Sequence, residues 1–516
     1  MRILRDLISC IDGIRCNGNT DIPIKTICTN SKKVQPDSLF VAVRGTRMDG
    51  HNFIEEAVKN GATAVVCEDP PPKRLPATTV IVPDSAKALA LLSAAFHSFP
   101  TKNMKLIGIT GTNGKTTTAI LIEQMLQSWA INTGRIGTLG YCWNHRSIKA
   151  SLTTPDPVIL QEIFSEMKND GVEAVVMEVS SHALAQNRIH GCLYDLCLFT
   201  NLSQDHLDYH KTMEDYFTAK ERLFLEHLKP SRWAVVNADD PYGKRLIEDL
   251  RNLNIKVISY GIDSKVADVK VTMMDCSTSG LEMEIETLRP IPQKIYINSS
   301  LLGSLNAYNI LASVAAGVVL GIPRETIAEG VRKVTKVEGR LEPVPIPADF
   351  NLIVDYAHTP DAMEKVLQCL REWTEGKLIV VFGCGGDRDP TKRPLMAQAA
   401  TRFGDVVIIT SDNPRTEDPQ QIIDHIVAGM PSHWKYVDPE RIVIQGRKSS
   451  YTVIPDRKEA IRLALTIAER NDTVFLGGKG HETYQIIGTQ HYPFDDRKVA
   501  LECFREINNL SSSLRL

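Results

Sequence analysis

The alternation of apolar runs with amphipathic stretches predicts a chain of short strands and helices. Near the start, β-like runs at 39–43, 64–67 and 79–82 alternate with helical patterns at 53–59 and 86–96. This alternation predicts a small α/β domain, which we expect to end at the polar linker 100–103.

From 105 to about 336, apolar runs recur and end in polar residues. The runs at 174–179, 196–200 and 233–236 lead into Glu-Val-Ser-Ser-His, Asn-Leu-Ser-Gln-Asp-His and Asn-Ala-Asp-Asp. Ligands of an open parallel sheet bind beyond the carboxyl ends of its strands. The polar residues expected to converge there are Glu178, His182, Asn201, Asp205, His206 and Asn237. Each of them taken alone fits a helix cap or a solvated loop equally well.

The last third of the chain repeats the pattern of a strand followed by a polar loop. Apolar runs at 352–354, 378–382, 406–410 and 473–476 each precede such a loop, which predicts a second doubly wound unit, dinucleotide-fold-like in outline. The loop after residue 382 lacks the G-x-G-x-x-G spacing, so the pattern does not indicate an NAD site. The predicted fold is therefore α/β with three domains, at 1–100, 101–338 and 339–516, of which the central one has a P-loop ATPase-type parallel sheet.

The segment 109–118, Ile-Thr-Gly-Thr-Asn-Gly-Lys-Thr-Thr-Thr, joins an apolar run at 105–109 to a helical pattern at 119–129. Its two glycines let backbone N–H groups form an anion nest at the positive end of the helix. Lys115 can neutralise terminal phosphates there, and the Thr116 hydroxyl can ligate Mg²⁺. Ile109 stands where the strict G-x-x-x-x-G-K-[ST] pattern has a glycine, and the alternative is a glycine-rich turn with a surface lysine.

Length, charge and cysteine content limit which classes of protein this chain can belong to. The 516 residues predict roughly three domains, and 43% hydrophobic with 23% charged residues is ordinary for a soluble protein. A net charge of −3 gives no general attraction to nucleic acid or to an anionic membrane. We find no stretch typical of a signal peptide or a membrane span, so we expect a cytoplasmic protein. The 11 cysteines lack Cys-x-x-Cys spacing, and most, such as Cys197 and Cys384, are predicted to be buried thiols.

Six segments together resemble the successive motifs of the Mur ligase family, and the resemblance covers nearly the whole chain. They are 110–116, 178–182, 201–210, 237–240, 303–309 and 355–358. Within the family, the chain most resembles the members that add diaminopimelate. The resemblance implies that ATP phosphorylates the D-glutamate side-chain carboxylate of UDP-MurNAc-L-Ala-D-Glu. The amine of meso-diaminopimelate would then displace the phosphate, giving a tripeptide for peptidoglycan synthesis, ADP and phosphate.

The resemblance also implies roles for individual residues. Lys115, Glu178, His206 and Lys220 would be catalytic, and Thr116, Glu178, His206 and Lys220 would surround magnesium, the lysine as a carbamate. A carbamate is an anionic oxygen ligand, whereas without the resemblance Lys220 would be taken as an exposed helix lysine. The implied ATP contacts are Gly111, Thr112, Asn113, Gly114, Lys115, Thr116 and Thr117, with Asn309, Arg340 and Asp355 at the adenine and ribose end.

By the same resemblance, the sugar-nucleotide substrate would contact Ser31, Thr46, Arg47, Thr153, Thr154, Ser180, Gln186 and Arg188. Leu152 stands where a polar residue is expected beside the threonine pair, and the segments around Ser31 and Thr46 fit polar turns by composition alone. Lys392 and Arg393 are cationic candidates for steadying the transferring phosphate, and a solvated helix start fits them as well.

The residues implied for meso-diaminopimelate are Arg388, Asp412, Asn413, Pro414, Arg415, Gly478 and Glu482. An arginine fork binds a carboxylate through two parallel hydrogen bonds, and Glu482 could pair with an ammonium group. A lysine-adding relative would be expected to lack Arg415, because lysine has no distal carboxylate. Without the resemblance, Asp-Asn-Pro-Arg is a turn.

Three alternatives remain open from sequence. They are a lysine-adding ligase, a folylpolyglutamate synthetase, and a regulatory protein that hydrolyses ATP to move domains. Arg415 argues against the first, Ser31 and the Thr153–Thr154 pair against the second, and Lys220 with His206 against the third. We expect a monomer whose domains close around small-molecule substrates, because the nucleotide and amino-acid loops must both meet the middle domain.

Overall fold

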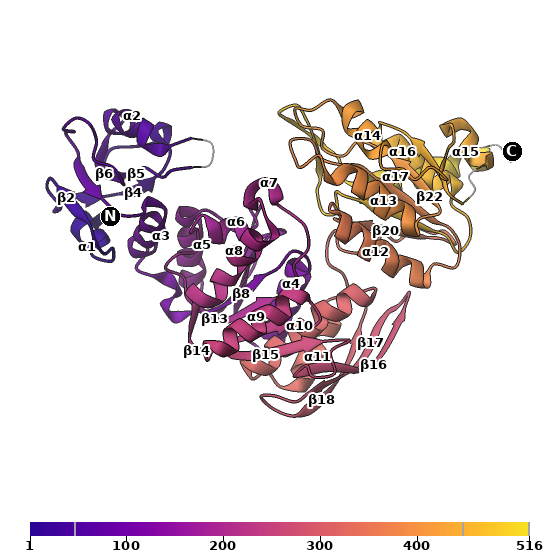
Figure 1. Ribbon diagram of the computed structural model, residues 1–516, viewed down its shortest axis with the longest axis horizontal. Helices are drawn as coiled ribbons and strands as arrows, with labels where there is room; N and C mark the ends of the chain where they lie inside the picture. The colour runs from indigo at the N-terminus through magenta and orange to yellow at the C-terminus, as the bar shows by residue number, and fades with distance from the viewer. Residues whose placement is uncertain (46–47, 446–447, 514–516) are drawn as a thin grey trace.

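A computed structural model describes residues 1–45, 48–445 and 448–513 and contains three main sheets in chain order (Figure 1). Helices cover the sheets, and parallel strands dominate each sheet, which confirms the predicted α/β class.

The first sheet has five strands in the order β2-β7-β6-β5-β4. All neighbours run parallel except β2, which pairs antiparallel with β7. Its strands are β2 Arg15–Asn17, β4 Thr26–Cys28, β5 Ser38–Val41, β6 Ala62–Cys67 and β7 Thr78–Ile81, and a separate pair joins β1 Arg2–Ile3 to β3 Pro23–Ile24. The helical elements are α1 Leu4–Ile8, η1 Ser31–Lys33, η2 Gly50–Phe53, α2 Ile54–Lys59 and α3 Ser85–Phe96. The expected linker forms one 3₁₀ turn, η3 Pro100–Asn103.

The middle sheet has eleven strands in the order β11-β10-β9-β12-β8-β13-β14-β15-β16-β17-β18. The strands from β9 to β16 in that order run parallel, and antiparallel strands extend both edges. The strands are β8 Lys105–Thr110, β9 Thr133–Gly137, β10 Gly140–Trp143, β11 Arg146–Ile148, β12 Ala174–Glu178, β13 Tyr194–Phe199, β14 Leu228–Asn237, β15 Lys256–Gly261, β16 Val269–Ser277, β17 Gly280–Thr287 and β18 Gln293–Ser299.

Helices pack on both faces of the middle sheet because its central strands are apolar on both faces. Ile107 packs in the cluster that includes helix residues Leu121 and Leu311, and Leu106 packs in another with Phe164 and Phe217. The helices are α4 Lys115–Ser128, α5 Pro157–Asn169, α6 Ser181–Ala185, α7 Leu207–His210, α8 Met213–Glu226, α9 Pro241–Asn252, α10 Ser304–Leu320 and α11 Arg324–Lys333.

The last sheet has seven strands in the order β19-β20-β25-β21-β22-β24-β23, parallel apart from β19. The strands are β19 Glu342–Pro343, β20 Asn351–Asp355, β21 Leu378–Phe382, β22 Val406–Ile409, β23 Lys435–Tyr436, β24 Ser450–Val453 and β25 Thr473–Gly477, followed by the hairpin β26 Tyr484–Ile487 and β27 Gln490–Pro493. The helices are α12 Pro360–Trp373, α13 Lys392–Phe403, α14 Pro419–Val427, α15 Pro439–Gln445, α16 Arg457–Ile467 and α17 Asp496–Ser513.

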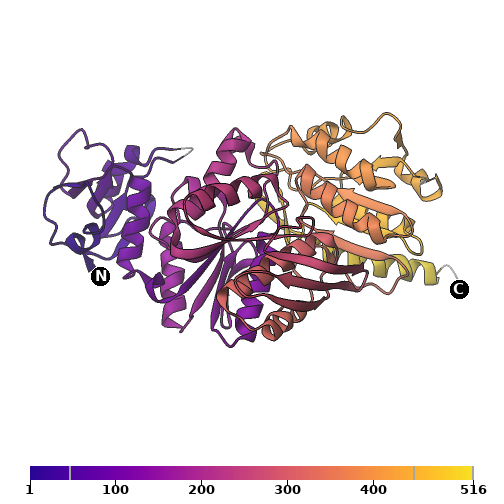
Figure 2. The same ribbon diagram turned by 60° about the horizontal axis from the view of Figure 1, so that its bottom comes forward.

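The three sheet regions are arranged so that the first and the last stand on either side of the middle one (Figure 1). In Figure 2, turned by 60°, the last region packs beside the middle one while the first extends from its other side. Polar loops after the parallel strands of the middle and last sheets line the same cavity, with Asp205 from the middle region and Asp412 from the last.

All eleven cysteines are free thiols. Cys197 is buried in β13, whereas Cys384 is buried in the loop after β21 rather than in the strand. The buried thiols are Cys67, Cys192, Cys197, Cys369, Cys384 and Cys503. Within the described ranges, no helix is long and apolar enough to cross a membrane.

Candidate active site

Two features fix the shape of the loop between β8 and α4: the positive φ angles of its glycines, and hydrogen bonds to Asn201 in the segment that follows β13. Gly111 and Gly114 have φ of +144° and +86°, and a Cβ on Gly111 would lie 1.9 Å from the Thr200 hydroxyl. Asn201, after β13, accepts a hydrogen bond from the Asn113 N–H at 2.9 Å through Oδ1, and its own carbonyl accepts one from Thr112 at 2.8 Å. These bonds fix the shape of the loop at the start of a 14-residue helix, whose N-terminal end favours an anion.

Lys115 folds over this loop. Its Nζ donates hydrogen bonds to the carbonyl oxygens of Gly111 and Thr112, at 2.9 and 2.8 Å. Burial lowers the pKa of Lys115, and the carboxylates of Glu178 and Asp205 oppose that effect. The ammonium is therefore held where phosphate oxygens would enter the nest.

Glu178, at the end of β12, is fully buried. It is hydrogen-bonded to the start of α4 and to the residue that follows β9. Its Oε2 accepts hydrogen bonds from the hydroxyls of Thr116 at 3.0 Å and Thr138 at 3.1 Å, and its Oε1 accepts one from the Thr138 N–H at 2.8 Å. The Thr138 hydroxyl also lies 3.1 Å from that of Thr153. Thr138 was missed in the sequence, although it is a polar residue just beyond the end of β9.

Two histidine rings contact each other edge to face beside the loop, with an angle of 89° between their planes. The rings of His182 and His206 have centroids 4.7 Å apart, and His206 has a left-handed backbone with φ +55°. Burial lowers the pKa of each to about 4. Burial tends to raise the pKa of the adjacent Asp205, but His206, His358 and Lys392 outweigh it and the pKa is lowered. The site therefore presents neutral imidazoles beside a carboxylate.

Lys220, on α8, is buried, with 1% of its surface exposed, so the exposed-lysine alternative is wrong. Its Nζ donates to the Gly111 carbonyl at 2.8 Å and lies 4.5 Å from the Tyr216 ring centroid. Burial, together with the charge of Lys115, puts the pKa of Lys220 well below its ordinary value. A neutral amine is the form that can react with CO₂, so the residue suits the carbamate that the resemblance implies.

The residues expected at the adenine and ribose end lie around the junction to the last sheet. Asn309 is close enough to the loop that a Cβ on Gly114 would lie 2.4 Å from its Oδ1. The Arg340 guanidinium lies 4.6 Å from the Tyr356 ring centroid. Asp355 is buried, which raises its pKa, and its two oxygens accept N–H bonds from Leu341 and Ala357 at 2.6 and 2.7 Å.

A contact that the sequence did not predict links the phosphate loop to the last region. The Asn113 side-chain amide donates to Asp361, on α12, at 3.3 Å. The phosphate loop therefore already touches the last region.

The residues expected to bind the sugar nucleotide are divided between two regions. Ser31 lies in the first region and donates to Glu56 at 2.6 Å, while Thr46 and Arg47 lie outside the described residues. The other five lie close together in the middle region: Thr153, Thr154, Ser180, Gln186 and Arg188. Within this group the Thr154 hydroxyl accepts from the Ser180 N–H at 3.0 Å, and Arg188 donates to the Thr154 carbonyl at 2.9 Å. Leu152 is exposed beside them and lines the cavity described below.

The residues expected to bind diaminopimelate lie in the last region. Arg415 has φ +51° and donates to the Gly386 carbonyl at 2.7 Å, and the Asn413 amide donates to Glu482 at 2.8 Å.

Arg393, expected as a phosphate contact, is instead buried and donates to both carboxylate oxygens of Glu417, at 2.9 and 2.8 Å, so it braces a loop. Lys392 does line the cavity and donates to the His358 carbonyl at 3.0 Å.

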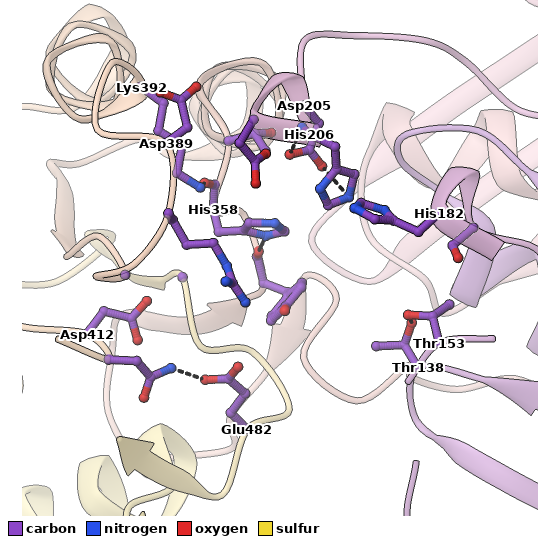
Figure 3. A pocket seen from close by; sticks show the side chains of 18 of the residues that line it. Thr138, Thr153, His182, Asp205, His206, His358, Asp389, Lys392, Asp412 and Glu482 are labelled. Carbon is purple, nitrogen blue, oxygen red and sulfur yellow. Dashed lines mark hydrogen bonds and ion pairs between the residues drawn. The ribbon is translucent and has the colours of Figure 1, made fainter. Parts of the chain in front are cut away.

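A cavity of about 540 Å³ lies between the residues expected to bind the sugar nucleotide in the middle region and those expected to bind diaminopimelate in the last region. In Figure 3, Asp412 and Glu482 lie on one side and Thr138 and Thr153 on the other, with His358 between them. The phosphate loop lies behind the cavity wall, joined to it through Glu178 and Thr138. Predicted site residues that line the cavity are Thr153, Ser180, Arg188, His206, Arg388, Asp412, Asn413, Arg415, Gly478 and Glu482.

The oxygen donors next to the loop suit magnesium. Thr116 and Glu178 bring oxygen atoms within 3.0 Å of each other, and Mg²⁺ is usually bound by one or two carboxylates together with substrate phosphates. In the part of the chain that the structure describes, no group of three His, Cys, Asp or Glu residues could hold a metal ion on its own.

The phosphate loop backs one wall of the cavity, and an α/β region with arginines and carboxylates forms the opposite wall. This arrangement is that of a nucleotide-dependent ligase. Family models described as "Mur ligase family, catalytic domain", "Mur ligase middle domain" and "Mur ligase, glutamate ligase domain" match residues 23–97, 109–317 and 339–480. The chain belongs to the Mur ligase family.

Individual relatives match nearly end to end. The UDP-N-acetylmuramoyl-L-alanyl-D-glutamate–2,6-diaminopimelate ligases of Geobacillus thermodenitrificans and Geobacter metallireducens are each 44% identical, over 98% of this chain and 99% of the relative. A solved structure of a ligase of the same name has a TM-score of 0.68 and 31% identity, covering 98% of this chain and 99% of that one.

Proposed function

We propose that this ligase joins meso-diaminopimelate to UDP-N-acetylmuramoyl-L-alanyl-D-glutamate at the expense of ATP. The observation that carries the proposal is Arg415 and Glu482 lining the same cavity as Asp205 and His206, beside the phosphate loop. A guanidinium and a carboxylate suit the distal end of a diamino diacid, which carries one carboxylate and one ammonium. The names of the 44% identical relatives support the same substrate pair. ATP and UDP-linked sugars are cytoplasmic metabolites, so the proposal places the reaction in the cytoplasm.

The chemistry needs an activated carboxylate, because a free carboxylate is a poor electrophile. The γ-phosphoryl group of ATP moves to an oxygen of the D-glutamate side chain, and the bond to the β-phosphate oxygen breaks. The nest at Gly111–Gly114 and the ammonium of Lys115 would hold the phosphates during this step.

Magnesium, when bound, would offset phosphate charge. Thr116 and Glu178 would hold one ion, and His206 with a carbamate on Lys220 a second. Thr138 would keep Glu178 oriented, because it donates two hydrogen bonds to that carboxylate.

In the second step, the neutral amine attacks the acyl carbon, the C–N bond forms and the C–O bond to phosphate breaks. The proton that the nitrogen loses leaves with the phosphate or passes to water. Arg415 and Arg388 would hold the distal carboxylate of the diamino acid and Glu482 its ammonium, so that the reacting amine points at the acyl phosphate. A lysine substrate would leave Arg415 without a carboxylate partner.

The test is phosphate release by the purified protein with MgATP and UDP-MurNAc-L-Ala-D-Glu, with meso-diaminopimelate or L-lysine added in turn. We expect release, together with a tripeptide of the correct mass, only with diaminopimelate. Release with lysine alone would refute the assigned amine, and release independent of either amine would favour a regulatory ATPase.

A further inference from the structure

A buried lysine lies beneath the residues proposed to bind the diamino acid. Lys479 is in the loop after β25, and 0% of its side chain is exposed. Its Nζ donates to Glu482 Oε2 at 3.0 Å, to Asn413 Oδ1 at 3.3 Å and to Asp412 Oδ1 at 3.4 Å. An ammonium has three N–H groups, and here each has one acceptor.

These contacts leave one carboxylate oxygen of Glu482 for a ligand. Oε2 accepts bonds from both Lys479 and the Asn413 amide, the second at 2.8 Å. In the ranges 1–45, 48–445 and 448–513, Oε1 accepts no hydrogen bond, and Glu482 lines the cavity together with Asp412 (Figure 3). The lysine thus fixes Oε2 of Glu482, and because the carboxylate is rigid it also fixes the direction of Oε1.

The charges of this cluster do not cancel. Asp412 and Glu482 carry two negative charges and Lys479 one positive charge, so one negative charge remains. Arg457, which interacts electrostatically with both carboxylates, is itself neutralised by a buried ion pair with Asp496 at 2.6 Å. An incoming ammonium would balance the remaining charge in a site largely shielded from water. The titratable and charged groups around Glu482 are Asp412, Lys479, Arg457, Tyr356, Tyr484, Arg415 and His481. Burial lowers the pKa of His481 to about 3, so this imidazole adds no charge at neutral pH, and the positive charge of Arg415 is assigned to the distal carboxylate of the substrate.

We propose that Lys479 is a positioning residue that holds Glu482 ready for the distal ammonium of the amine substrate, and so sets the preference for a diamino acid. The proposal rests on the proposed function. A role as catalytic base does not fit, because Nζ is enclosed and all of its N–H groups are engaged.

The test compares wild type with Lys479→Met and Lys479→Arg, using meso-diaminopimelate and 2-aminopimelate, which lacks the distal amine but keeps the distal carboxylate. Wild type should prefer diaminopimelate in kcat/KM by about 10- to 100-fold, the range for one charge-assisted hydrogen bond. Lys479→Met should lose most of that preference while KM for ATP stays within about twofold, and Lys479→Arg should restore part of it. A surface variant on the same region, Lys377→Met, which loses only an exposed pairing with Glu469, serves as control.

The pH profile gives a readout that a merely structural lysine would not move. Burial raises the pKa of Glu482, Asp412 raises it further, and Lys479 and Asn413 oppose both. Removing the lysine charge should therefore shift the acid limb of kcat/KM for diaminopimelate to higher pH, since the ammonium needs an ionised partner. An unchanged acid limb in Lys479→Met would overturn the proposal.

A double mutant keeps the test decisive if Lys479→Met does not fold. Relative to wild type, Glu482→Gln removes one negative charge, and adding Lys479→Met restores the original net charge, so the double mutant carries no extra buried charge. If Lys479 acts through Glu482, adding Lys479→Met to Glu482→Gln should change KM for diaminopimelate by less than about twofold. A further tenfold rise in KM would refute the positioning role. Failure of wild type to use diaminopimelate at all would instead refute the proposed function.

Discussion

Gly339, at the junction between the middle and last regions, offers a sharp test of how the linker supports the amine site. Its φ is +63°, and a Cβ there would lie 2.1 Å from the His481 backbone nitrogen and 2.5 Å from the Gly480 carbonyl carbon. Both contacts are to backbone, so no side chain can rotate to make room. The same loop carries Lys479 and Glu482.

The cost of Gly339→Ala has two parts. A left-handed backbone costs a residue with a Cβ about 1–2 kcal/mol, and forcing an atom into a packed site costs about 1–3 kcal/mol more. Gly321, after α10, serves as a control that carries the backbone cost without the packing cost. Its φ is +80°, and a Cβ there would meet nothing within 4 Å. Gly339→Ala should therefore be more destabilising than Gly321→Ala by the packing part, about 1–3 kcal/mol.

Urea denaturation of both variants measures the change in the free energy of unfolding, and steady-state kinetics measures the function. Because the loop must shift by backbone movement, Gly339→Ala should also raise KM for the amine substrate, whereas Gly321→Ala should not. Equal destabilisation by the two substitutions, or an unchanged KM for the amine in Gly339→Ala, would show that the linker backbone does not support the amine site.

The site leads to three further predictions. Arg415→Ala should raise KM for diaminopimelate about 10- to 100-fold, since it removes a charge-assisted contact, and leave KM for ATP nearly unchanged in steady-state assays. Lys115→Met should lower kcat by about 10²–10³-fold while nucleotide still binds, as measured by calorimetry, because the nest remains. Burial lowers the pKa of His182 and His227 from 6.5 to about 4, so the unfolded chain binds more protons than the folded one between these values. The free energy of unfolding should therefore fall as pH drops through that window, and His227→Gln should weaken this dependence in denaturation curves.

Much of the fold could be predicted because its signals are local. The apolar run before 109 and the helical pattern after 119 are β8 and α4, and the glycines between them adopt the positive φ values that a phosphate nest requires. Parallel strands buried on both faces leave continuous apolar runs in the sequence, and polar residues follow them where the strands end.

The sequence was less informative where a residue's role depends on its neighbours in space. Arg393 and Lys392 are adjacent in sequence, yet one is buried against Glu417 and the other lines the cavity. The sequence gives no signal for the role of Lys479, because two of its three acceptors, on Asp412 and Asn413, lie more than sixty residues earlier in the chain. Thr138 likewise gained a role only through its contact with Glu178.

Periodicity and residues close together in the chain were thus enough to predict most of the parallel strands, the phosphate loop and the motifs of the family, but not the antiparallel strands at the sheet edges. Which charges are buried, which carboxylate oxygens are left for a ligand, and which loops meet across the cavity became known from the three-dimensional arrangement. The physical reason is that desolvation and pairing depend on all the atoms around a group, and most of those atoms lie far away in the sequence.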